Sequence, residues 1–256
     1  MKLYRQLLTE NDCYRTGAAL TPKGVMVHST GADNPNLSRY VGPEDGRLGP
    51  VSSRNWNRPG VGACVHAFIG KLPDGSVAVY QTLPWTVRGW HAGGKANDTH
   101  LSFESCEDDL TDPDYFRAAY GQAVELTAFL CGRFGLDPLE PGVVICHSEG
   151  CRLGIASNHA DVMHWFPRHG QTMEDFRRDV AAALAPKPQP EEDYARFCRL
   201  MERYRRELGG KAPALPVPFE EAKALSVTDG SRPGDLATRE ECAVMVRNAL
   251  RRLEQT

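Results

Sequence analysis

The sequence has no long hydrophobic run. None of its 256 residues lie in a stretch that approaches the roughly 18 apolar residues of a membrane span. Residues 1–12 also lack the apolar segment and the small-residue cleavage site of a secretory signal peptide. We therefore expect no membrane insertion and no signal peptide, and a chain that is made and folds in the cytoplasm.

A strong excess of charge is also missing. The chain has 30 Lys and Arg residues against 33 Asp and Glu, which gives a formal net charge of −3. This balance provides no general attraction to nucleic acid or to anionic membranes, so we expect neither as a partner. Hydrophobic residues make up 41% of the chain, enough for a packed core and inconsistent with global disorder.

No Cys-x-x-Cys pair occurs among the eight cysteines, which are scattered along the chain. In a chain of this length without an export signal, such spacing favours free thiols over a framework of disulfides.

Short apolar or alternating segments, bounded by Gly, Pro and Asp, predict strands at residues 24–28, 63–71, 76–83, 101–106 and 143–147. The turn sequence at residues 73–75 predicts a hairpin. Helices are predicted at residues 113–134, between an Asp-Pro start and a Gly end, and from a capping box at residue 172 to about residue 185. This pattern predicts one α/β domain over residues 1–185, with a mixed central sheet flanked by helices.

Residues 186–190, Pro-Lys-Pro-Gln-Pro, predict an extended linker. Beyond it, residues 191–256 predict a small helical module. It has an amphipathic helix at 191–208, a short helix at 216–225 and a last helix for which Thr238 and Glu241 form a capping box. A module of this size would be marginally stable alone.

Three residues far apart in the sequence form a candidate metal site. His28 and His147 each end an apolar run, and Asp161 follows fourteen residues after His147. Zinc binds imidazole nitrogen and carboxylate oxygen, and three protein ligands leave a fourth position for water, as in catalytic sites. The spacing matches no short zinc motif, and most histidines bind no metal, so the residues alone make this a hypothesis.

Cysteines near His147 are alternative ligands. Neighbouring residues of a strand point to opposite faces, so Cys146 is excluded if His147 faces the site. We interpret Cys151 as structural, and Cys64 and His66 form a further Cys-x-His pair.

Glu104 stands in a short apolar segment, where burial of a carboxylate is costly. It is either a surface residue on an edge strand or the base that activates water.

Four stretches in a fixed order carry a family resemblance. They are residues 20–31, the Gly-Trp-His-Ala-Gly segment at 89–93, Ser-Phe-Glu at 102–104, and residues 146–166. Together they resemble the type-2 N-acetylmuramoyl-L-alanine amidases, which share a fold with peptidoglycan recognition proteins. The likeness spans roughly residues 8–180 and is closest to phage endolysins and to prophage or autolytic amidases of Gram-positive bacteria.

The resemblance implies roles for these residues. It implies that His28, His147 and Asp161 hold Zn²⁺, and that Glu104 activates water to cut the bond between N-acetylmuramic acid and L-alanine in peptidoglycan. His159 stands where relatives often have a lysine, and we expect it to stabilise the oxyanion. His91 matches a position near the substrate groove, and His91 and Trp90 are predicted to bind substrate.

For the C-terminal module the resemblance is weaker. Residues 228–233 and 237–241 are similar to surface-layer-homology modules, which predicts binding to the bacterial cell wall. A helical appendage that packs on the catalytic domain or dimerises is the alternative. An endolysin without a signal peptide would stay in the host cytoplasm until a holin opens the membrane.

Two alternative functions stay open. One is a peptidoglycan-binding protein without catalysis. The other is a zinc enzyme that cuts a different bond, as a peptidase or muramidase would.

Overall fold

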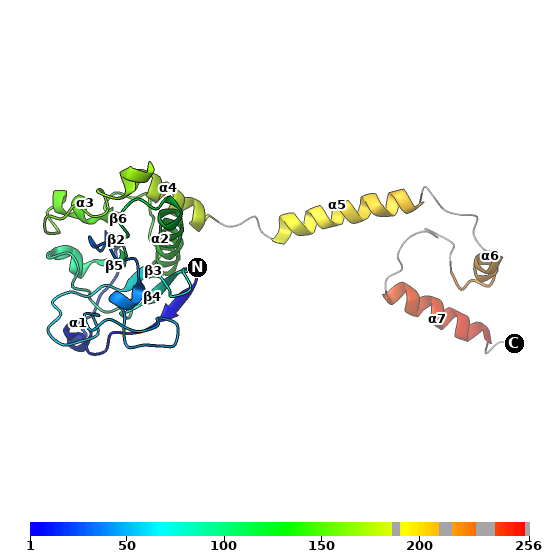
Figure 1. Ribbon diagram of the computed structural model, residues 1–256. Coiled ribbons are helices and arrows are strands. Elements are labelled where there is room, and N and C mark those ends of the chain that lie inside the picture. Colours follow the sequence, from blue (N-terminus) through cyan, green and yellow to red (C-terminus); the bar gives the residue numbers. More distant parts are fainter. Residues whose placement is uncertain (186–189, 210–216, 229–238, 254–256) are drawn as a thin grey trace. The chain divides into compact units, whose positions relative to one another are not determined.

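The computed structural model divides into two compact units, Met1–Ala185 and Pro186–Thr256 (Figure 1). The structure describes residues 1–185, 190–209, 217–228 and 239–253. The predicted linker at 186–190 therefore lies outside the described residues except for Pro190, which begins a helix. The expected cap Thr238 and most of the wall-module motif at 228–233 also lie outside them.

A six-stranded mixed sheet forms the centre of the first unit. Its strand order is β1-β4-β3-β5-β2-β6, and only β3 and β4 pair antiparallel, around the predicted turn at residues 73–75. The strands are β1 (Leu3–Arg5), β2 (Gly24–Ser29), β3 (Ala67–Lys71), β4 (Val77–Gln81), β5 (His100–Ser105) and β6 (Val144–Cys146). The predicted mixed α/β architecture is confirmed.

Two helices, α2 (Pro113–Phe134) and α4 (Met173–Leu184), cover one face of the sheet (Figure 1). Asp112 caps α2 by accepting hydrogen bonds from two backbone N–H groups, and Gly135 ends it in the left-handed conformation. Thr172 caps α4. Alternate strand residues, including Val27 and Phe103, pack into the core beneath these helices.

The opposite face is covered mainly by the long connection between β2 and β3, where a second core forms around Tyr40, Phe68 and Tyr80. The connections contain short elements: α1 (Asp12–Thr16), η1 (Leu37–Arg39), η2 (Lys95–Asp98), α3 (His147–Arg152) and η3 (Phe166–His169).

Because β2, β5 and β6 are parallel, their carboxyl ends lie at the same edge of the sheet. That edge is where open α/β sheets commonly bind ligands. His28 and Glu104 are register partners there, on neighbouring strands. The prediction that His147 ends a strand is wrong: β6 ends at Cys146, and His147 is the first residue of α3.

The second unit contains α5 (Pro190–Gly209), α6 (Val217–Ala224) and α7 (Arg239–Leu253). These helices lie close to the ranges predicted from the sequence. Among the described residues, no helix combines the length and the apolar character needed to span a membrane.

Candidate metal centre

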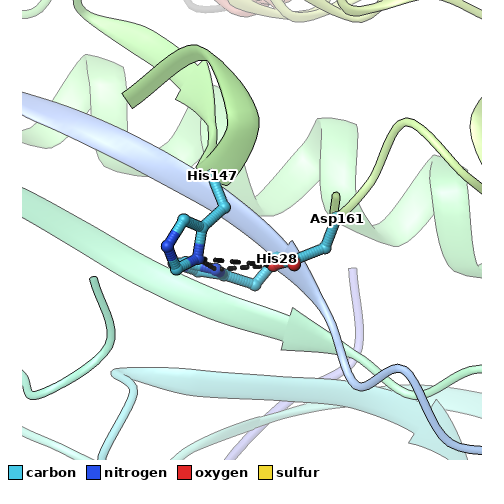
Figure 2. A group of neighbouring side chains, drawn as sticks. All are labelled: His28, His147 and Asp161. Atoms are coloured by element: carbon cyan, nitrogen blue, oxygen red, sulfur yellow. Dashed lines mark hydrogen bonds and ion pairs between the residues drawn. The ribbon is translucent and has the colours of Figure 1, made fainter. Parts of the chain in front are cut away.

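His28, His147 and Asp161 converge on one point, although they come from three different elements (Figure 2). His28 extends from β2, His147 from the start of α3, and Asp161 from the connection between α3 and η3. Both histidines are buried, with exposed fractions of 1% and 4%. Over the described part of the chain this is the single group of residues with metal-binding geometry.

The spacing of the three donor atoms suits a small tetrahedral ion. His28 Nδ1 lies 3.0 Å from Asp161 Oδ2 and 3.2 Å from His147 Nδ1, and His147 Nδ1 lies 3.6 Å from Asp161 Oδ2. An ion about 2.0 Å from each atom of a tetrahedral ligand set would place the ligand atoms about 3.3 Å apart. The predicted ligand set therefore fits zinc in both chemistry and dimensions.

The other nitrogen of each ring is held by a second residue. His28 Nε2 lies 3.0 Å from His91 Nδ1, and His147 Nε2 lies 3.1 Å from Ser157 Oγ. Residues in these positions orient the metal-binding histidines in many metal sites.

The ligands' pKa values favour their metal-binding forms. Burial lowers the pKa of His28, so its ring is neutral at neutral pH. Burial raises the pKa of Asp161, but hydrogen bonds with His147 and His28 outweigh it, and the pKa lies well below its usual range. A neutral imidazole and an ionised carboxylate are the forms that bind a metal.

Glu104 lies on the same face of the sheet as His28. Its strand, β5, runs between β3 and β2, so the alternative of an edge-strand surface residue is wrong. The Oε2 atom is buried and accepts no hydrogen bond from the described residues. Burial, and then the negative charges of Asp161 and Glu107, raise the pKa of Glu104 well above its ordinary value.

The structure also places the three other residues predicted for catalysis or substrate binding. His159 is exposed, and its ring centroid lies 4.6 Å from that of His147, so it borders the ligand group. His91 is half-buried and lies against His28. Trp90 is half-buried, and its backbone forms two hydrogen bonds with Cys64. Their predicted roles stay predictions.

The cysteines near the site are not part of the ligand group. Cys146 packs into the core beneath α2, and its Sγ lies 3.2 Å from Ser148 Oγ. Cys146 is therefore excluded as a ligand, as predicted. The predicted reason was that Cys146 and His147 are neighbours in one strand, but His147 is the first residue of a helix. Both ring nitrogens of His66 form hydrogen bonds elsewhere: Nε2 donates to the carbonyl of Val87, and Nδ1 accepts the N–H of Ser102.

One buried pair escaped the sequence analysis. Glu107 is 3% exposed, and its Oε1 lies 2.9 Å from His164 Nε2 and accepts the N–H of Gly31 at 3.0 Å. His164 is three residues after Asp161, so this contact joins the segment of the third ligand to the loop after β2. The sequence offers only a carboxylate three residues after Glu104, at the start of a Glu-Asp-Asp run, and this signal alone identifies no partner.

The sequence model of the N-acetylmuramoyl-L-alanine amidase family matches residues 18–167, more than half of the chain. The chain belongs to this family. The matched range contains all three candidate ligands and Glu104, and no residue of the C-terminal unit. No curated protein matches this chain.

Solved structures share the amidase fold. The structure of the Staphylococcus aureus hydrolase AmiA in complex with its ligand is similar, with a TM-score of 0.56 at 19% identity, over 72% of this chain and 83% of that one. The catalytic domain of XlyA has a TM-score of 0.50 at 20% identity, over 70% of this chain and 99% of that one. At these identities the likeness shows the fold alone.

Proposed function

We propose that this amidase works with a zinc ion held by His28, His147 and Asp161, and that it cuts peptidoglycan between N-acetylmuramic acid and the L-alanine of the stem peptide. Family membership supports the reaction. The convergence of three donor atoms at tetrahedral spacing is the observation that carries the metal requirement.

A bound zinc ion would supply a Lewis acid, which polarises an amide carbonyl and makes water a stronger acid. The proton transfers are carried out by a residue of the protein. Glu104 takes a proton from the attacking water and then delivers it to the leaving amine. Its raised pKa suits this role, because the carboxyl group can hold a proton until the amine needs it.

His159 is proposed to stabilise the negative charge that develops on the amide oxygen. Its exposed ring beside His147 can direct an N–H group toward a substrate that enters from solvent. Trp90, which precedes His91 in the sequence, is proposed to contact the substrate.

The C-terminal unit is proposed to bind the cell wall, joined to the catalytic unit by the Pro-rich segment at residues 186–190. The substrate lies outside the cytoplasmic membrane. We therefore propose that the protein acts as an endolysin, which a holin-type pore releases from the host cytoplasm.

Lysis of purified cell walls tests this proposal. The zinc-loaded protein is expected to clear a wall suspension, a chelator to stop clearing, and added zinc to restore it. Mass spectrometry of the products should show free stem peptides that begin with L-alanine. Wall binding without product release would support the non-catalytic alternative, and fragments cut within the stem peptide or the glycan would support a peptidase or muramidase.

A further inference from the structure

We propose that Arg177 is a positioning residue of the metal centre, because it fixes the turn between β6 and α3 from which the candidate ligand His147 extends. It acts through Glu149 and through the backbone of β6. This inference rests on the metal site of the proposed function, and it gives that site a support on α4, a helix that holds none of the three candidate ligands.

His147 lies where the chain changes from strand to helix. Strand β6 ends at Cys146, and His147 is the first residue of α3, so the direction of its side chain depends on how this helix begins. Glu149 is the third residue of α3, and its Oε2 accepts the N–H of Cys146 at 3.1 Å. A carboxylate that reaches back in this way fixes the first turn of a helix.

Arg177 forms hydrogen bonds on both sides of this turn. Its Nη1 lies 3.0 Å from Glu149 Oε2, and its Nη2 lies 3.3 Å from Glu149 Oε1. Nη1 also donates to the carbonyl of Val144 at 3.0 Å, and Val144 belongs to β6, which lies at the edge of the sheet. One planar guanidinium group therefore joins the strand that precedes His147 to the helix that begins with it.

Helix α4 gives Arg177 a fixed base. Phe176 and Val180, on the same helix, are buried in the core that α4 shares with α2 and the sheet. The side chains of Arg177 and Glu149 are 24% and 18% exposed, so solvent screens this pair less than a pair on the surface. Hydrogen bonds between a guanidinium group and both oxygens of a carboxylate are directional, whereas apolar packing is not. The pair can therefore fix how the start of α3 is oriented.

Neighbouring arginines differ from Arg177 in their contacts. Arg152 also faces Glu149, but it is 70% exposed and its Nη2 lies 3.9 Å from Oε1. Arg178 follows Arg177 in α4 and is paired at the surface with Glu174 and Asp175 of its own helix. It is therefore a matched control, with the same side chain and charge on the same helix.

The test compares Arg177→Met with Arg178→Met in the full-length protein. Zinc affinity is measured by competition with a chelator, and the absorption spectrum of the Co²⁺-loaded protein reports the coordination geometry. Arg177→Met keeps an apolar stem but loses the guanidinium group, so zinc should bind about 10-fold more weakly and the Co²⁺ spectrum should change. Arg178→Met should change neither, and Arg177→Lys, which keeps the charge, should recover part of the affinity. Lower stability of Arg177→Met with unchanged zinc affinity and spectrum would overturn the proposal.

Glu149→Ala tests the route through the carboxylate. Because Arg177 acts through Glu149, the double variant Arg177→Met/Glu149→Ala should bind zinc little more weakly than Glu149→Ala alone. Losses that add in full would overturn this route. The single variant also decides the question if Arg177→Met fails to fold, since zinc affinity equal to that of the wild type would leave Arg177 without the group through which it acts.

Amide hydrogen exchange in the metal-free protein separates this inference from the proposed function. The N–H of Cys146 should exchange faster in Arg177→Met than in the wild type or Arg178→Met, because its acceptor on Glu149 is no longer held in place. Equal exchange rates in the three proteins would overturn the proposal. If the wild-type protein bound no zinc, the proposed function would fail, while these rates would still judge whether Arg177 fixes the start of α3.

Discussion

Glu104 and Asp161 are two carboxylates at one edge of the sheet with opposite pKa shifts. Burial and the negative charges of Asp161 and Glu107 raise the pKa of Glu104, whereas Asp161 lies beside two histidine rings that lower its own. When the pKa values of two neighbouring acids are shifted in opposite directions, the two acids can take different chemical roles. At the residue scale the separation fits the proposed roles, in which Asp161 is the permanent anion of the ligand set and Glu104 is the group that exchanges protons.

Glu104→Gln should separate catalysis from metal binding. The amide has nearly the shape of the carboxyl group but cannot accept a proton, so the turnover number at neutral pH should fall by about 10²–10⁴-fold. Zinc content, measured by atomic absorption, should stay at the wild-type ratio because Glu104 is not a ligand. Wall lysis at the wild-type rate by this variant would remove Glu104 from the mechanism.

The same substitution should alter how stability depends on pH. The pKa of Glu104 is raised in the metal-free folded protein above the unfolded value of about 4.3. Folding therefore favours the protonated form, and this contribution is full below the unfolded pKa and is lost as pH rises toward the folded pKa. The free energy of unfolding of the metal-free wild type should fall relative to Glu104→Gln by about 1.4 kcal/mol per pH unit in that interval. Urea unfolding at about pH 5 and about pH 8 measures this, and a difference that does not change with pH would contradict it.

Asp161→Ala should lower the zinc content of the purified protein, because it removes one of three ligands and the charge that partly neutralises the ion. Zinc per protein after dialysis against a weak chelator is the measurement. Glu140→Ala is the matched control, because it removes an exposed carboxylate that precedes β6, near the end of that strand opposite to His147. Equal zinc content in Asp161→Ala and Glu140→Ala would exclude Asp161 as a ligand.

At the scale of elements, the helices and strands that could be predicted are those whose ends depend on residues close together in the chain. Helix α2 begins and ends at the predicted residues because Asp112, Pro113 and Gly135 act within one turn of its ends. Strand β1, only three residues long, was missed because its pairing with β4 depends on residues more than 70 positions away.

The same distinction between local and long-range interactions applies to the candidate site. The candidate ligands could be named from the apolar runs before the two histidines and from the family resemblance. The contacts that His91 and Ser157 make with the rings of His28 and His147 could not, because they depend on how distant segments lie against each other in the folded chain. The start of α3 at His147 was also missed, since the segment after Val144 reads as a continuing strand.

The Glu107–His164 contact should hold the segment that carries Asp161. Glu107→Ala would leave the N–H of Gly31 and the ring of His164 without their acceptor, which should destabilise the metal-free protein by about 1–3 kcal/mol. It should also weaken zinc binding, because Asp161 loses a fixed position. Glu107→Gln keeps an acceptor oxygen and should recover most of both losses. Thermal unfolding and chelator competition measure the two effects, and a loss of stability with unchanged zinc affinity would limit Glu107 to a structural role.

At the scale of the whole molecule, the two units differ in how they are built. Within the part of the chain that the structure describes, the clusters of buried hydrophobic residues lie in residues 1–185, as do the candidate ligands and Glu104. The described part of the second unit is helical and leaves large apolar side chains of α5 exposed: Tyr194, Phe197, Leu200 and Tyr204. The first unit therefore contains the residues proposed for the reaction, and the described part of the second unit has exposed apolar surface.

Truncation after residue 185 should separate catalysis, proposed for the first unit, from wall binding, proposed for the second. The shortened protein should fold, bind zinc and cleave a soluble muramyl peptide at the full-length rate, because neither its core nor its ligands are changed. It should bind purified walls more weakly in a pelleting assay and lyse them more slowly, because the substrate is insoluble and the second unit no longer keeps the enzyme on it. Light scattering of the full-length protein distinguishes the alternative. A dimer that becomes monomeric on truncation, with wall binding unchanged, would identify the second unit as a dimerisation module rather than a wall-binding one.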